Sequence, residues 1–155
     1  LLSSLIQYQK GKLEPGLLES LLQLRMMMEP TFARLAALHR TDEQLARFRG
    51  ILLEEEAAPR RNARKITDLD FEFHLLVAVA SGNTVYPLLL NSFRPVYTNL
   101  SGQFFRDPQV ITTVHQYHRD LTRAIERKSD KKAESVMKAI LAHGEQTLRD
   151  VIDAG

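Results

Sequence analysis

Cysteine is absent from this 155-residue sequence, and glycine and proline are scarce, at 7 and 6 residues. Without cysteine there is no disulfide framework and no thiolate metal site, so any metal would need histidine, carboxylate or water ligands. No apolar run reaches the roughly 18 residues that span a bilayer, and no signal-peptide pattern opens the chain. We therefore expect a cytoplasmic protein that makes no use of a membrane.

A dense basic block is also absent. The formal net charge is +2, and so mild a charge gives no reason to infer nucleic-acid binding by these residues. Hydrophobic residues make up 44% of the chain and charged residues 26%, which suits one domain with a substantial core. The scarcity of glycine and the lack of strand-like alternation favour an all-α protein over a disordered or collagen-like one.

Apolar residues recur at helical spacing between turn signals along most of the chain. The predicted helices span residues 1–9, 17–39, 42–56, 60–81, 84–105, 108–127 and 131–151. The Thr41-Asp42 pair and Asp107 are typical of helix N-caps, and Gly82 is typical of a left-handed C-cap. Pro30 and Pro95 fall inside predicted helices, where we expect kinks. About seven helices with short connections predict an antiparallel bundle.

An aspartate and a histidine interrupt one of the most apolar of these helices. Asp70 and His74 are four residues apart and share a helix face with Ile66, Phe73 and Val77. Burying a charged group without a partner is costly. We therefore expect this inward-facing pair to meet a cation or another polar partner in the core.

Two further histidines fall on the apolar stripes of other helices. His118 continues the stripe from Val114 toward Leu121, and His143 continues the stripe that contains Ile140. With the aspartate–histidine pair, this places one carboxylate and three imidazoles on the inward faces of three helices. Inward ligands from separate helices are an ordinary way to build a metal centre in a bundle core.

A structural role for these residues competes with metal binding. A single histidine on an apolar face is more often a core residue hydrogen-bonded to a neighbour than a ligand, and periodicity alone does not bring the helices together. His115 lies near the edge of its stripe, and His39 lies at a helix end, where we expect it to be solvated. Arg25 stands in a mostly apolar stretch and could face an anionic ligand, or pair with Glu29 four residues on.

Three segments, taken in order, resemble the C-terminal effector-binding domain, or FCD domain, of GntR-type transcription regulators of the FadR subfamily. They are the arginine-containing stretch 21–37, the Asp70-to-His74 spacing followed by Ser81-Gly82-Asn83, and residues 117–130. The resemblance covers nearly the whole chain and implies a sensor domain rather than an enzyme. It also implies a winged helix-turn-helix DNA-binding domain upstream. No such module is visible here, and because Leu1 already falls in a predicted helix, we expect a preceding segment.

The resemblance also assigns roles to residues. By position, the family's divalent-metal ligands match Asp70, His74, His118 and His143. Zinc is the expected metal, with nickel, manganese or iron as alternatives, and a small carboxylate effector would bind beside it. The expected effector-binding residues are Arg25, Tyr86, Asn91 and Tyr97. Because imidazole must be neutral to bind a metal, occupancy should weaken as the pH falls through about 6.5.

Effector binding is expected to shift the bundle between two arrangements and reorient the DNA-binding domains of a homodimer. Two alternatives stay open. The spacing from His118 to His143, together with Tyr86 and Tyr97, is similar to members of the family that respond to fatty acyl-CoA without the complete metal set. The other alternative is a helical-bundle metalloenzyme, although no histidine here follows a glutamate by three residues, as in di-iron bundles.

Overall fold

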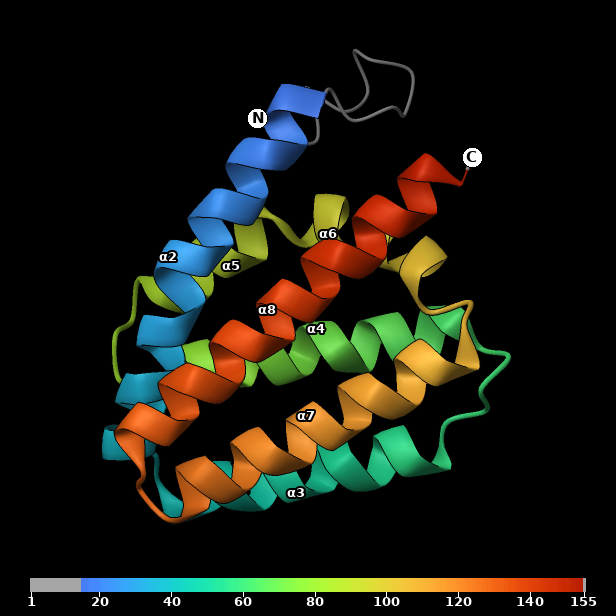
Figure 1. Cartoon of the computed structure of the whole chain (residues 1–155). Helices are drawn as coiled ribbons and strands as arrows, with labels where there is room; N and C mark the ends of the chain where they lie inside the picture. The colour runs from blue at the N-terminus through green and yellow to red at the C-terminus, as the bar shows by residue number, and fades with distance from the viewer. Residues whose placement is uncertain (1–14, 155) are drawn as a thin grey trace.

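The computed structural model describes residues 15–154, and all the regular structure in that range is helical (Figure 1). The helices are α2 (Pro15–His39), α3 (Asp42–Ala57), α4 (Ala63–Ala80), α5 (Tyr86–Ser92), α6 (Arg94–Phe104), α7 (Pro108–Glu126) and α8 (Asp130–Asp153). This confirms the predicted all-α class, while the helix predicted at 1–9 lies outside the described residues. None of the described helices is both long and apolar enough to cross a membrane.

Local side-chain chemistry sets several helix ends where the sequence predicted them. The Thr41 hydroxyl accepts a hydrogen bond from the backbone N–H of Gln44, and the Gln44 side chain accepts one from the Thr41 N–H, which makes a capping box at the start of α3. Asp107 accepts from the N–H of Gln109 and so caps α7. Gly82, with φ of +82°, takes the left-handed conformation just after α4.

The prediction of one helix over residues 84–105 is wrong. The chain forms two helices, α5 and α6, which are separated at Phe93. Pro95 is the second residue of α6, a position in the first turn where the missing backbone N–H of proline costs no hydrogen bond within the helix. Pro30, by contrast, lies within α2, which continues to His39.

The centre of the bundle is α4, which contacts α2, α3, α5 and α6. Around it, α7 packs against both α3 and α8, and α8 crosses in front of α4 and packs against α2 (Figure 1). The largest fully buried side chains of the main core are those of Phe32, Phe48, Phe71 and Phe73. Burying each contributes about 1.5–3 kcal/mol. Polar residues on α4 are therefore held by well-packed neighbours.

Candidate metal centre

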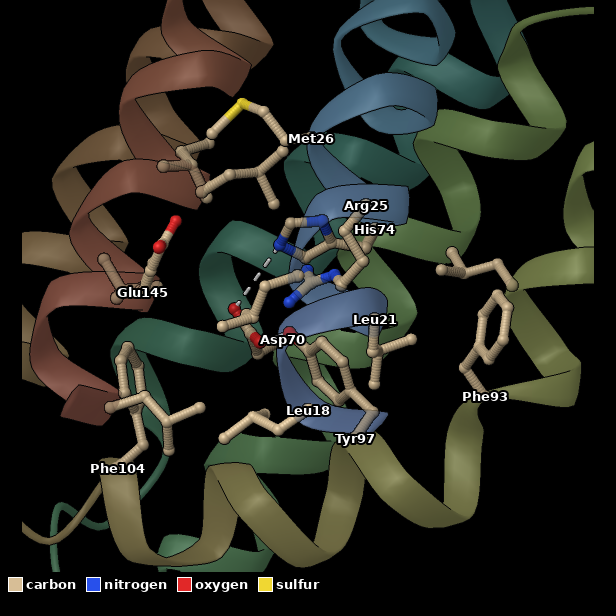
Figure 2. Close-up of a pocket in the computed structure, with 17 residues that line it drawn as sticks. Leu18, Leu21, Arg25, Met26, Asp70, His74, Phe93, Tyr97, Phe104 and Glu145 are labelled. Carbon is tan, nitrogen blue, oxygen red and sulfur yellow. Dashed lines mark hydrogen bonds and ion pairs between the residues drawn. The ribbon is translucent and has the colours of Figure 1, made fainter. Parts of the chain in front are cut away.

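Two histidines and an aspartate converge in the core. Asp70 and His74 come from successive turns of α4 and His118 comes from α7, and all three are buried. One ligand atom from each residue lies within 4.8 Å of the others. The Nε2 atoms of His118 and His74 are 3.3 and 3.9 Å from the same oxygen, Asp70 Oδ1. Figure 2 shows Asp70 and His74 facing one another across this space.

A buried glutamate binds each of the two imidazoles at the ring nitrogen that points away from Asp70. His74 donates from Nδ1 to Glu29 Oε1 and His118 donates from Nδ1 to Glu55 Oε1, both at 2.5 Å. Carboxylates in this position fix the tautomer and orientation of metal-binding histidines. Each ring is thereby left with Nε2 toward Asp70, and Nε2 of His118 is buried without a hydrogen-bond partner. A carboxylate with two such nitrogens suits zinc and several other first-row metals.

Sequence reasoning missed both glutamates. From the sequence, Glu29 is expected only as a partner of Arg25, and Glu55 belongs to the acidic run of residues 54–56 that ends the helix predicted at 42–56. A signal for Glu55 was present, because it follows Phe48 and Ile51 at helical spacing and so belongs to the buried stripe of α3. Its neighbours in the run, by contrast, are more exposed.

The charges of the site stabilise one another. Burial raises the pKa of Asp70, but the neighbouring imidazoles of His118 and His74 outweigh burial and lower it to about 2. Burial lowers the pKa of His118, but Glu55 and Asp70 outweigh burial and raise it to about 9. In the metal-free protein His118 is therefore an imidazolium at neutral pH. A metal at Nε2 would have to displace that proton.

Arg25 and Tyr97 close one side of the site. Arg25 donates from Nε to Glu29 Oε2 at 2.6 Å, so the ion pair considered from the sequence is confirmed. Its guanidinium also lies over the Tyr97 ring, 4.8 Å from the ring centre. The Tyr97 hydroxyl donates to Asp70 Oδ2, the carboxylate oxygen that the histidines leave free. Two predicted effector-binding residues thus lie beside the metal-ligand candidates.

A cavity leads from this polar group out between α2, α6 and α8 (Figure 2). Its interior volume is about 80 Å³, and its mouth opens to solvent. Arg25, Asp70, His74 and Tyr97 form its polar lining on α2, α4 and α6, and Glu145 adds a carboxylate from α8. The other lining side chains are apolar, namely Leu18, Leu21, Leu22, Met26, Leu90, Phe93, Phe104, Val114, Ile140, Leu141 and Leu148.

His143, the fourth predicted ligand, stands apart from this cluster. It lies on α8, half-buried, with its ring 5.7 Å from that of Tyr117 and 6.2 Å from that of Phe104. It is not among the residues whose ligand atoms approach one another within 4.8 Å, and it does not line the cavity. Its Nδ1 is buried without a hydrogen-bond partner, and burial lowers the pKa of the ring.

Two predicted effector-binding residues also lie outside the cavity lining. The Tyr86 ring packs 4.2 Å from that of Phe32 in the core, and Asn91 is exposed on α5. Of the remaining histidines, His115 is buried on α7 away from the cavity and His39 is exposed, as its position at a helix end predicted.

Comparison with known proteins identifies the family. Residues 20–143 match the model of the FCD domain. The Nta operon transcriptional regulator of Aminobacter aminovorans is 31% identical over 137 residues, which cover 88% of this chain and 64% of that protein. The fatty acid metabolism regulator protein of Klebsiella pneumoniae (strain 342) is 28% identical over 112 residues, which cover 72% of this chain and 45% of that protein.

A solved structure supports the same assignment. The chain matches a Streptococcus agalactiae GntR with a TM-score of 0.68 and 28% sequence identity, covering 82% of this chain and 57% of that one. The chain thus spans 45–64% of the length of these relatives. It belongs to the FCD domain family and is the effector-binding domain of a GntR-type transcription regulator of the FadR subfamily.

Proposed function

We propose that this domain binds a divalent metal ion through Asp70, His74 and His118, with zinc as the leading candidate and nickel, manganese or iron as alternatives. The observation that carries the proposal is the orientation of the two imidazoles. Each is anchored at Nδ1 by a buried glutamate, and each directs Nε2 toward Asp70 Oδ1. This is the carboxylate–histidine arrangement that holds metal ligands in place.

The effector in this proposal is a small carboxylate that binds in the adjoining cavity. A divalent ion held by the three ligands would act as a Lewis acid toward the carboxylate. Arg25 and Tyr97 line the same end of the cavity, where they would orient the ligand by hydrogen bonds and charge. The apolar walls beyond them would exclude water and strengthen these interactions.

Control of DNA binding completes the proposed function. The cavity lies between α2, near the beginning of the described chain, and α8 at its other end. A ligand held between them would favour one packing of the two helices over another. We propose that this change is passed to a DNA-binding domain preceding this chain, in a homodimer that acts in the bacterial cytoplasm.

Metal analysis of the purified chain tests the site. We expect about one metal ion per chain in the wild type and a loss of metal in the Asp70→Ala and His118→Ala variants, because each substitution removes a ligand. His39→Ala is the matched control, since it removes an exposed imidazole. If both ligand variants kept as much metal as the control, the site assignment would be refuted.

An acyl effector bound without a metal is the second candidate, and the apolar lining of the cavity favours it. From the sequence, an acyl pocket would be built from Met26, Phe73, Tyr86, Phe93 and Tyr97. Of these residues, Met26, Phe93 and Tyr97 line the cavity, whereas Phe73 and Tyr86 do not. Native mass spectrometry distinguishes the two functions: a bound acyl chain with no metal would favour the second.

A further inference from the structure

Glu145 on α8 lies at the mouth of the cavity. Its side chain is 36% exposed, twice the 18% of Arg25 at the inner end. Glu145 also lines a groove on the surface, which includes Glu19 on α2. Figure 2 shows Arg25 and Glu145 on different walls of the cavity. The cavity therefore runs from a buried end beside Arg25 to an open end beside Glu145.

The interior of the cavity is too small to hold a ligand of more than a few carbon atoms. Its volume is about 80 Å³, compared with about 370 Å³ for the groove outside it. Because a water molecule takes up about 30 Å³ in the liquid, the interior has room for a carboxylate and only a few further atoms. The outer end of a longer ligand must therefore pass Glu145 and lie in the groove beside Glu19.

One guanidinium is shared by two carboxylates at this mouth. Arg149 Nη2 donates hydrogen bonds to Glu145 Oε1 at 2.8 Å and to Glu19 Oε2 at 2.9 Å. Among the described residues, Arg149 is the only ion-pair partner of either glutamate, so the three side chains carry a net charge of −1. The second oxygen of each carboxylate accepts no hydrogen bond from the described part of the chain. These two oxygens are therefore available to water or to a ligand.

The two ends of this path favour opposite charges. At the inner end, the Arg25 guanidinium favours an anion. At the outer end, the negative net charge and the two available carboxylate oxygens favour a positively charged group with several N–H donors, such as an ammonium. Leu22 and Met26 line both the cavity and the groove, so the part of a ligand that connects its two ends meets apolar walls.

We propose that Glu145, together with Glu19, selects effectors with a positive charge at their outer end, so that the favoured ligand is a carboxylate joined by a short apolar chain to an ammonium group. This inference rests on the proposed function, which puts the carboxylate at the inner end, and adds the chemistry of the opposite end. It also opposes the acyl-CoA candidate, because the phosphates of that head group would lie beside two carboxylates and be repelled.

The selection is measured with matched ligands of two chain lengths. The longer set is 6-aminohexanoate, hexanoate and adipate, which share a six-carbon chain and end in an ammonium, a methyl and a carboxylate group; the shorter set is 4-aminobutyrate, butyrate and succinate. Calorimetry in one zinc-containing buffer gives the dissociation constants. For the chain length that fits best, the ammonium ligand should bind about 5- to 30-fold more tightly than the dicarboxylate, because attraction and repulsion at half-exposed charges each contribute up to about fivefold.

Substitutions at the mouth change its net charge in steps. The summed charge of Glu19, Glu145 and Arg149 is −1 in the wild type, and it becomes −2 in Arg149→Gln, 0 in Glu145→Gln and +1 in the Glu19→Gln/Glu145→Gln double variant. The preference for the ammonium ligand should grow in Arg149→Gln, shrink in Glu145→Gln and reverse in the double variant, while the affinity for the methyl ligand stays the same. Glu134→Gln, on α8 but outside the cavity and the groove, is the matched control.

All the substituted side chains at the mouth are at least 36% exposed, so the fold should tolerate these changes. If the wild type binds the three ligands of each set within about twofold of one another, or if the double variant keeps the wild-type preference, this inference is refuted while the carboxylate site stands. If none of the six ligands binds, the carboxylate effector of the proposed function and this inference are refuted together.

Discussion

Substitution of Glu55 tests how the protein holds His118, one of the proposed metal ligands. Its side chain is 3% exposed, and its Oε1 accepts the hydrogen bond from His118 Nδ1 at 2.5 Å. We expect Glu55→Gln to weaken metal binding by about 10- to 100-fold, because an uncharged partner makes the imidazole a poorer ligand and orients it less firmly. Glutamine has nearly the shape of glutamate, so the core packing should be preserved.

The raised pKa of His118 shows how strongly Glu55 and Asp70 together stabilise its charged imidazole. The rise from 6.5 to about 9, achieved against burial by Glu55 and Asp70 together, corresponds to about 3 kcal/mol at about 1.4 kcal/mol per pH unit. A 10- to 100-fold loss of metal affinity is about 1.4–2.7 kcal/mol, the same order of magnitude as the combined effect of Glu55 and Asp70 on this imidazole.

The same substitution has a pH signature in the metal-free protein. Because the pKa of His118 is raised on folding, its stabilising contribution is fully present below about pH 6.5 and is lost as the pH rises through about 9. Glu55→Gln should therefore lower the free energy of unfolding at about pH 6 and have a much smaller effect above about pH 9.5. Urea unfolding in the presence of a chelator measures both.

Glu56→Gln is the matched control, because Glu56 is the next residue of α3 and is exposed. It should leave zinc affinity and the pH dependence of stability unchanged. If Glu55→Gln behaved like Glu56→Gln in the chelator competition, the hydrogen bond to His118 would have no role in metal binding and the orienting role of Glu55 would be wrong.

Three other measurements follow from the same contacts. Zinc binding near neutral pH should release about one proton from His118, and zinc affinity should rise about tenfold per pH unit up to the His118 pKa of about 9. Calorimetry in buffers of different ionisation heat measures the released proton. Zinc binding without proton release would contradict the assignment of His118 as a ligand. Arg25→Met should destabilise the fold by about 3 kcal/mol in urea unfolding, because it leaves Glu29 buried with His74 as its remaining partner; an unchanged midpoint would contradict this. Thr41→Ala should cost about 1 kcal/mol through the lost cap and leave zinc affinity unchanged.

The helices could be predicted from the sequence because the residues that form and end each helix lie close together along the chain. Apolar periodicity marks the helices, and the residues at Thr41, Asp107 and Gly82 mark their ends through contacts within a few positions. The inward Asp70 and His74 were predicted in the same way, from one helix face. The break at Phe93 was missed because Pro95 is compatible both with a kink inside one helix and with the first turn of a second.

The parts of the site that were not predicted depend on contacts between helices. The apolar arc of α8 is wide enough to contact two neighbours, and periodicity does not tell which edge faces the cavity. Ile140 lies on the cavity edge and His143 on the edge that meets Tyr117. Tyr86 and Tyr97 fall in a single helix of the sequence prediction. In the structure α5 and α6 are separate helices, so Tyr86 packs against Phe32 whereas Tyr97 donates a hydrogen bond to Asp70.

The buried charges of this core are not needed for stability, which supports the proposed metal site. Glu29, Glu55 and Asp70 are carboxylates with almost no exposure, and a well-packed apolar core of the same volume would often be at least as stable. The network is also incomplete, because Nε2 of His118 faces Asp70 without a hydrogen-bond partner. Unpaired polar atoms in an otherwise satisfied network are costly. In the proposed metal site, a cation that displaces the proton of His118 would bind this nitrogen and the Asp70 carboxylate at once.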